Sequence, residues 1–201
     1  RRLVIDFNID VSSGGGGSAI GDGSTITSIE ILDLKLWRGN DVIVGGDYKD
    51  RIFSRGGADN ISGGGGDDYL AGGLSFDVVS GGDGNDRIVS EDIDQIDGGD
   101  GIDLLELDRH NAFLTKPITL DIMAMPEDIG DGTRVANIER LVYDGSSHVD
   151  RISGGDLDDD INGSSGANVL QGRGGNDRLE GSGKLFGGAG NDILDGDGML
   201  D

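Results

Sequence analysis

A large aliphatic residue recurs every nine positions along most of this chain. It stands at Ile43, Ile52, Ile61, Leu70, Val79, Ile88, Ile96 and Leu105, and again at Ile152, Ile161, Leu170, Leu179, Leu185 and Leu194. One aliphatic residue in nine is too sparse for a helix face or for a conventional two-sided strand. It fits a strand of roughly three residues whose middle side chain points inward. Because one such strand cannot bury its own apolar residue, the pattern predicts a stack of short parallel strands.

The polar positions follow the same period. Glycines and an acidic residue precede each aliphatic residue, so that the repeat reads G-G-x-G-x-D-x-U-x, as in GGDGNDRIV at 81–89. The sixth position holds Asp41, Asp50, Asp59, Asp68, Asp77, Asp86, Asp94 and Asp103, then Asp150, Asp159, Asn168, Asp177, Asp192 and Asp201. Glycine permits tight turns with positive φ, and stacked turns place carboxylates beside uncovered carbonyl oxygens. Such columns repel one another unless a hard cation joins them, and Ca²⁺, with six to eight oxygen ligands, is the best match.

The repeats form two blocks, 36–106 and 145–201, and each block follows a segment without the period. These leading segments, 1–35 and 107–144, alternate apolar and polar residues and are predicted to be strand-rich. Residues 21–50 resemble residues 130–159 without a gap, so a leading segment and the start of its block occur twice. The sequence therefore predicts an all-β chain with four parts, in which the second block is truncated.

Near-complete copies of the repeat identify a resemblance to the RTX, or haemolysin-type calcium-binding repeat, family. They are GGGGDDYLA at 63–71, GGDGNDRIV at 81–89, GGDGIDLLE at 98–106 and GGAGNDILD at 187–195. The resemblance implies a parallel β-roll, a right-handed β-helix with two repeats per turn. It also implies that several calcium ions lie between stacked loops, held by the aspartates of position six and by loop carbonyl groups.

The ligands that the resemblance implies include both acids and glycines. They are Asp41, Asp50, Asp59, Gly63, Gly65, Asp68, Asp77, Gly81, Asp83, Asp86, Gly98, Asp100, Asp103, Asp150, Asp159, Asn168, Gly172, Asp177, Gly187, Asp192 and Asp201. Two repeats per turn divide the acids of the first block into two sides. We expect well-occupied sites between residues 50 and 68, 68 and 86, and 86 and 103, because loops 63–68, 81–86 and 98–103 match the consensus. Loops 54–59, 72–77 and 90–94 depart from it, so we expect weak or absent ions on that side.

The second block is expected to differ between its two sides as well. Loops 154–159, 172–177 and 187–192 share one side and carry acids. On the other side, Asn168 offers only a neutral oxygen, which predicts a weaker site, and segment 181–186 (GSGKLF) has no acid at all.

The composition of the chain predicts that its folding depends on calcium. The 201 residues include 40 glycines and carry a net charge of −23, which is typical of a disordered chain in the absence of counter-ions. Roughly six to eight Ca²⁺ ions would supply about 12 to 16 positive charges, so metal binding would contribute to the folding free energy. The alternative, a solvated linker without metal, would not keep an aliphatic residue in phase. The acidity argues against nucleic acid or an anionic membrane as partner.

The sequence predicts no enzyme. Neither His110 nor His148 lies in an HExxH motif, and there is no G-x-S-x-G elbow. The chain has no cysteine, which fits a secreted bacterial protein, and no segment has the length of a transmembrane helix. No signal peptide or initiator Met is present, so we interpret the chain as a fragment of a longer protein.

The function expected from these observations is that of a calcium-binding module that folds outside the cell and supports a larger secreted protein. Type I export is implied by the family resemblance. The alternative is a non-catalytic adhesive or accessory module that binds a surface glycan or polysaccharide, for which Trp37 is a candidate stacking residue.

Overall fold

The computed structural model describes residues 5–7, 25–26, 32–35, 39–110, 116–124 and 127–201. Every regular element among these residues is a β-strand. The chain divides into two compact units, unit 1 (Arg1–Asp103) and unit 2 (Leu104–Asp201). Most of the strand-rich segment predicted at 1–35 lies outside the described residues, and so does Trp37.

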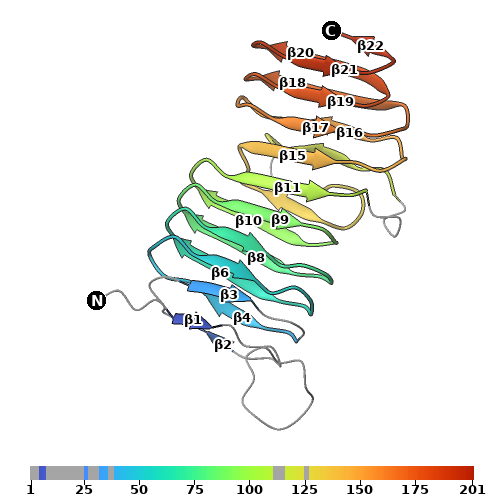
Figure 1. Ribbon diagram of the computed structural model, residues 1–201. Helices are drawn as coiled ribbons and strands as arrows, with labels where there is room; N and C mark the ends of the chain where they lie inside the picture. The colour runs from blue at the N-terminus through green and yellow to red at the C-terminus, as the bar shows by residue number, and fades with distance from the viewer. Residues whose placement is uncertain (1–4, 8–24, 27–31, 36–38, 111–115, 125–126) are drawn as a thin grey trace. The chain divides into compact units, whose positions relative to one another are not determined.

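Unit 1 is a stack of short strands that alternate between two parallel sheets (Figure 1). The strands of one sheet are, in order, β1 (Ile5–Phe7), β3 (Leu32–Lys35), β5 (Arg51–Phe53), β7 (Tyr69–Ala71) and β9 (Arg87–Ser90). The strands of the other are β2 (Thr25–Ile26), β4 (Val42–Val44), β6 (Asn60–Gly65), β8 (Val78–Asp83) and β10 (Gln95–Asp100). Each strand pairs with the second strand along the chain, so one coil of the roll contains two repeats.

The register of unit 1 stacks the aliphatic residues on one another. Leu70 pairs with Ile52 on one side and with Ile88 on the other, and all three are fully buried. In the second sheet, Ile61 pairs with Ile43 and Val79 in the same way. The core is therefore a thin pair of aliphatic ladders between the sheets.

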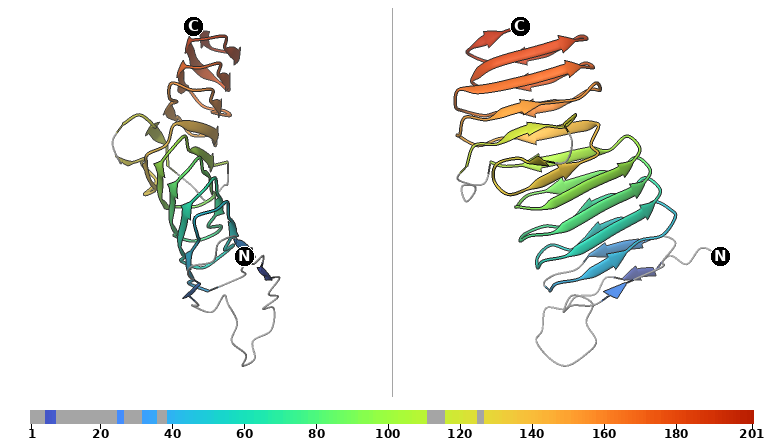
Figure 2. Two further views of the ribbon diagram at one scale, coloured as in Figure 1. Left: turned by 90° about the vertical axis from the view of Figure 1, so that its left-hand side faces the viewer. Right: turned by 180° about the vertical axis from the view of Figure 1, so that it is seen from behind.

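Unit 2 has the same arrangement of two parallel sheets, but its first strands come from a segment without the nine-residue repeat. One sheet contains β11 (Leu104–Asp108), β15 (Arg140–Asp144), β17 (Asp160–Asn162), β19 (Arg178–Glu180) and β21 (Ile193–Asp195). The other contains β12 (Thr119–Asp121), β16 (Arg151–Ser153), β18 (Asn168–Gly174), β20 (Gly183–Ala189) and β22 (Met199–Leu200). Within each unit, the two further views show the same succession of rungs (Figure 2). A short antiparallel pair, β13 (Glu127–Asp128) and β14 (Arg134–Ala136), is the exception to the parallel pattern.

The start of unit 2 has a more conventional core than the repeats have. Among the described residues between 104 and 144, nine apolar side chains are buried in addition to Leu105: Leu107, Ile118, Leu120, Ile122, Ile129, Val135, Ile138, Leu141 and Tyr143. They arise from closely spaced apolar positions rather than from one residue in nine. The prediction of an all-β parallel roll is confirmed, and the aliphatic positions of the repeat are buried, apart from Leu194, which is partly exposed.

Candidate metal sites

The sixth residue of the repeats forms ladders along the edges of each unit. The backbone N–H of Asp50 donates to Oδ1 of Asp68, that of Asp68 to Oδ1 of Asp86, and that of Asp86 to Oδ1 of Asp103, at 2.7–2.8 Å. We call this the 50–103 ladder. On the opposite edge the same bonds, at 2.8–3.0 Å, join Asp41, Asp59, Asp77 and Asp94 into the 41–94 ladder. The two sets are those that two repeats per turn predict.

Unit 2 has two corresponding ladders. Asp159, Asp177 and Asp192 form the 159–192 ladder through the bonds Asp159 N–H to Asp177 and Asp177 N–H to Asp192. Asp150 and Asn168 form the 150–168 ladder, in which the N–H of Asp150 donates to Oδ1 of Asn168. The expected ligand Asp201 is exposed, and its carbonyl oxygen accepts a hydrogen bond from the N–H of Gly187.

The second carboxylate oxygen distinguishes these aspartates from ordinary hydrogen-bonded side chains. Oδ2 of five of them is buried and has no hydrogen-bond partner: Asp59, Asp68, Asp77, Asp86 and Asp177. A buried charged oxygen without a donor costs several kcal/mol, on the order of the desolvation of an ion. Beside Oδ2 of Asp68, Asp86 and Asp177 lies a carbonyl oxygen of the next loop on the same edge, so a bound cation or a proton would compensate this charge.

The glycines of the loops bring the oxygens together. A Cβ atom on Gly81 would lie 2.1 Å from Oδ2 of Asp86 and 2.3 Å from the carbonyl oxygen of Gly98. At Gly63 the corresponding distances, to Asp68 Oδ2 and the Gly81 carbonyl oxygen, are 2.1 and 2.6 Å. Glycine is thus required at residues 63 and 81, because a side chain there would displace the carboxylate of its own loop and a carbonyl group of the next loop on the same edge.

Burial changes the acidity of these carboxyl groups. It raises the pKa of Asp68 and of Asp77 from 3.8 to about 7, and neighbouring carboxylates of the same ladder add to the effect. Burial likewise raises the pKa of Asp159 and Asp177 to about 6 and that of Asp86 above its ordinary value. The loops therefore hold negative charge poorly unless a cation is bound, and their all-oxygen donor set suits Ca²⁺.

The residues at position three of the repeat bond to the preceding coil through their backbone rather than through their side chains. The Asp83 and Asp100 side chains are exposed. Their carbonyl oxygens accept hydrogen bonds from Gly66 and Gly84 in the preceding coil, both at 2.8 Å. These carbonyls join successive loops, and each retains a second lone pair.

Two buried serines in unit 1 are features that the sequence interpretation missed. Ser54 and Ser90 stand where the consensus has its first glycine, and both are buried. The hydroxyl of Ser54 donates to the carbonyl oxygen of Gly72 at 2.8 Å, and that of Ser90 donates to Oδ2 of Asp94 at 2.6 Å. The sequence shows that the first glycine is lost, and this loss predicts a degenerate loop. It does not predict the hydrogen bond that the serine hydroxyl makes there.

A buried ion pair at the start of unit 2 was also not foreseen. Arg109 is buried, and its Nε donates to Oδ2 of Asp131 at 2.9 Å. Other guanidinium nitrogens donate to Oγ1 of Thr133 and to the carbonyl oxygen of Asp108. Here an arginine, instead of a metal ion, compensates a buried carboxylate.

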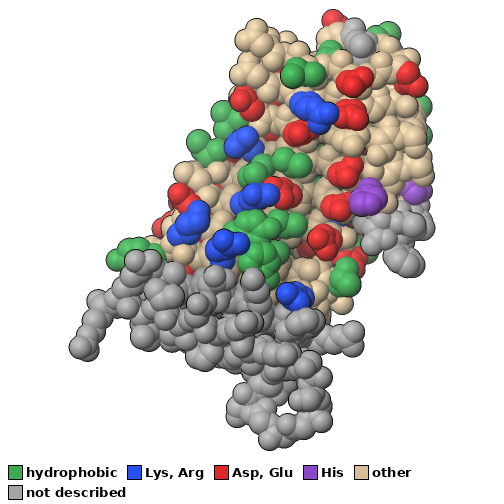
Figure 3. Space-filling model, viewed as in Figure 1, with side chains coloured by type: hydrophobic (Ala, Val, Ile, Leu, Met, Phe, Trp, Pro, Cys, Tyr) green, Lys and Arg blue, Asp and Glu red, His purple; other side chains and the backbone are tan. Residues whose placement is uncertain are grey.

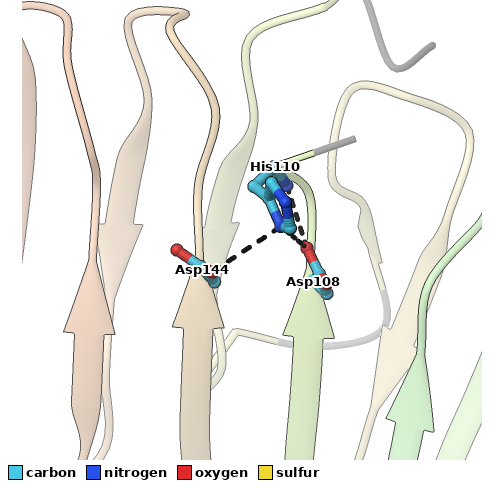
Figure 4. A group of neighbouring side chains, drawn as sticks. All are labelled: Asp108, His110 and Asp144. Carbon is cyan, nitrogen blue, oxygen red and sulfur yellow. Dashed lines mark hydrogen bonds and ion pairs between the residues drawn. The ribbon is translucent and has the colours of Figure 1, made fainter. Parts of the chain in front are cut away.

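His110 lies at a second group of possible metal ligands, with Asp108 and Asp144 at the ends of β11 and β15 (Figure 4). Asp108 and Asp144 face each other across β11 and β15. Nδ1 of His110 lies 2.9 Å from Oδ1 of Asp108 and 3.8 Å from Oδ2 of Asp144. All three side chains are substantially exposed. His148 contacts Ser146 through Nδ1 at 2.7 Å.

The parallel roll and its oxygen-lined loops define a calcium-binding β-roll. The chain belongs to the family of the RTX calcium-binding nonapeptide repeat, whose family model matches it in four copies, at residues 38–70, 62–105, 144–183 and 184–198. These copies cover more than half of the chain, and the segment between residues 105 and 144 lies outside them. A search among curated proteins found no match.

Membership of this family indicates Ca²⁺ as the ligand of the roll and a structural rather than a catalytic role for the repeats. Among the described residues there is no helix that is long and apolar enough to cross a membrane.

Proposed function

We propose that this chain is a folding module that binds several Ca²⁺ ions and acquires its roll when it meets extracellular calcium. The single observation that carries the proposal is the burial of Oδ2 of Asp68 and Asp86 without a hydrogen-bond donor. These oxygens lie beside carbonyl oxygens of the next loop. Without a cation, the folded state would confine the charge of both groups in a site that raises their pKa.

The charge of the whole chain supports the same conclusion. With a net charge of −23, the chain repels itself in a compact state, and calcium offsets this repulsion. Extracellular calcium modules bind with dissociation constants of about 10⁻⁴–10⁻³ M. The cytosolic calcium concentration would leave such sites empty, whereas millimolar calcium outside would shift the equilibrium towards the fold by mass action.

The ladders support a proposed placement of the ions. The best sites lie between the loops of residues 50 and 68, 68 and 86, and 86 and 103, and the 159–192 ladder holds further ions. The blocks 36–106 and 145–201 are the calcium-dependent parts, whereas the leading segments 1–35 and 107–144 extend or cap the roll. The module belongs to a larger secreted bacterial protein, for which type I export is the route, because repeats of this family are typical of secreted bacterial proteins.

Circular dichroism in the far ultraviolet tests the proposal. The full chain should be largely unfolded in chelator and should gain β-structure when millimolar Ca²⁺ is added. Mg²⁺ is the matched control, because its strict octahedral geometry and reluctant dehydration fit these loops poorly. A chain that is fully folded in chelator, or that calcium leaves unchanged, would contradict the proposal.

A specific surface feature favours glycan binding as a second candidate function. On the outer face of β5, β7 and β9, the Arg51 guanidinium lies 5.7 Å from the centre of the Phe53 ring and 5.9 Å from that of Tyr69. The Arg87 guanidinium lies 5.3 Å from the Tyr69 ring. Phe53 also lines a hollow of about 320 Å³ with Arg55. Figure 3 shows Lys and Arg side chains among hydrophobic ones on the face that it draws.

In such a cluster the aromatic rings can pack against sugar rings, and the guanidinium groups can bind the acidic substituents of the sugars. A glycan array in saturating calcium tests this function, with Arg51→Ala and Arg87→Ala as variants. Arg178→Ala, which removes a half-exposed arginine from unit 2, is the control. The function requires that only the first two variants lose binding to an acidic glycan.

A further inference from the structure

Asp150 differs from the aspartates of the 159–192 ladder because a side-chain hydroxyl, and not only backbone N–H groups, donates to its carboxylate. Oδ1 accepts from the N–H of Ile118 and Oδ2 accepts from the hydroxyl of Tyr143, both at 2.8 Å. Oδ2 of Asp177, on the opposite edge of unit 2, has no hydrogen-bond partner. On the edge of Asp150 a tyrosine therefore satisfies this oxygen, whereas on the other edge it is open at Asp177 and accepts only the backbone N–H of Gly155, at 2.8 Å, at Asp159.

The Tyr143 side chain occupies space that belongs to the loop in a regular repeat. It is buried, and a Cβ on Gly145 would lie 2.8 Å from its Cε1, with Oδ2 of Asp150 and the carbonyl oxygen of Asn162 both farther away, at 3.2 Å. At Gly172 the same test meets Oδ2 of Asp177 at 2.0 Å and the carbonyl oxygen of Gly187 at 2.6 Å. The aromatic ring thus stands where two oxygens converge in the other ladder.

Asn168 provides the second substitution on this edge. Its Oδ1 accepts from the N–H of Asp150 at 2.9 Å, as an aspartate would. Its Nδ2 takes the place of Oδ2 and donates to the carbonyl oxygen of Gly163 at 2.7 Å. An amide nitrogen carries partial positive charge and ligates no calcium. It also uses a carbonyl oxygen of the kind that would coordinate an ion.

The number of carboxylates in the loops also argues against a calcium site on the edge of Asp150. Loops 145–150 (GSSHVD) and 163–168 (GSSGAN) contain one carboxylate between them. Loops 154–159 (GGDLDD) and 172–177 (GRGGND) contain four. Calcium affinity depends on the number of charged ligands, so the edge with one carboxylate, already bonded at both oxygens, has little to offer an ion.

We propose that Tyr143 and Asn168 replace calcium on this edge, so that unit 2 binds calcium along the 159–192 ladder and closes the 150–168 ladder by hydrogen bonds alone. The inference rests on the proposed calcium-dependent folding and narrows it. Asp150 and Asn168 become structural residues instead of ligands. In the folded roll these hydrogen bonds hold the edge without an ion, and the edge supplies a fixed side against which the calcium-dependent loops stack.

Calcium stoichiometry of the full chain, measured by equilibrium dialysis, tests this assignment. Asp150→Asn keeps the shape of the side chain and should bind as many ions as the wild-type chain. The matched variant Asp177→Asn should bind at least one ion fewer. A folded Asp150→Asn chain that loses an ion would overturn the inference. If this variant fails to fold in calcium, Asn168→Ala answers the same question, because a ligand at residue 168 would be lost with its ion.

A variant that restores the consensus residues should increase the number of bound calcium ions. Tyr143→Leu, which places an aliphatic residue opposite Ile161, combined with Asn168→Asp removes the ring and both donors and adds a carboxylate, and the doubly substituted chain should bind one additional ion. An unchanged count in a folded chain would contradict the claim that these two side chains exclude calcium. A wild-type chain that binds no calcium is a separate outcome, because it rejects the proposed function itself.

Discussion

The backbone N–H of Asp68 donates a hydrogen bond to Oδ1 of Asp86, eighteen residues later, across 2.8 Å. Oδ2 of the same Asp86 carboxylate is buried and has no hydrogen-bond partner. One oxygen therefore fixes the spacing of two coils, while the other is available to the cation of the proposed calcium site. This division of roles explains why a carboxylate, and not an alcohol or an amide, is needed at the sixth position of a calcium loop.

Replacing Asp86 should weaken calcium-dependent folding more than replacing Asp77. Both substitutions to alanine leave a buried N–H without its acceptor, at a cost of about 1–3 kcal/mol. Asp86→Ala also removes a ligand from between two consensus loops, and each 1.4 kcal/mol of lost binding raises the calcium midpoint about tenfold. Asp77 stands on the ladder where Ser54 and Ser90 already close neighbouring loops. Calcium titrations followed by circular dichroism measure both midpoints, and equal shifts would refute the distinction.

The spacing of the sequence predicts the ladders but not the groups that replace calcium. Ile52, Leu70 and Ile88 stack because a period of nine, taken twice, equals one coil, and this relation is local to the repeat. The bond from Tyr143 to Asp150 depends on where a ring points outside the period, and spacing does not encode this. The contacts of Arg109 are even harder to predict from the sequence, because its partners Asp131 and Thr133 lie 22 and 24 residues away, beyond a segment with no repeat.

A methyl group on Gly81 should disrupt the 50–103 ladder, whereas one on Gly65 should be tolerated. The Cβ of Gly81→Ala would lie 2.1 Å from Oδ2 of Asp86, and such overpacking costs about 1–3 kcal/mol. The Cβ of Gly65→Ala would meet no atom closer than 3.6 Å, from Asp47. Neither glycine has a positive φ, so the pair isolates the effect of space. Thermal unfolding in saturating calcium gives the comparison; similar losses in both variants would mean that the oxygens do not converge beside Gly81.

The metal-free chain should be more folded in mild acid than at pH 8. The pKa values of Asp68 and Asp77 are 3.8 in their ordinary state and about 7 in the fold, and those of Asp159 and Asp177 are about 6. Because the folded state binds these protons more tightly than the unfolded state, protonation stabilises it. The contribution is complete below about pH 4 and is lost as the pH rises through 6 to 7.

Circular dichroism of the calcium-free chain at pH 5 and pH 8 checks the sign. The β-signal should be larger at pH 5. In calcium the trend should reverse, because protons compete with the ion for the same oxygens and the calcium midpoint should therefore rise on acidification. A calcium-free chain that folds better at pH 8 would show that the buried carboxylates are stabilised by something other than protons or metal.

Arg109 should stabilise unit 2 by a mechanism that calcium cannot replace. Its guanidinium is buried against Asp131 and Thr133, so Arg109→Ala leaves the Asp131 carboxylate buried without its counter-charge, at a cost of about 3–5 kcal/mol. Arg178→Ala is the control, because Arg178 is half exposed in its contacts with Asp160 and Glu180, and exposed pairs of this kind contribute about 0–1 kcal/mol. Urea unfolding of both variants in saturating calcium measures the difference in the free energy of unfolding. If more calcium restored the stability of Arg109→Ala, the ion pair would be an accessory to the metal sites; if it does not, the start of unit 2 is held by side chains of the chain itself.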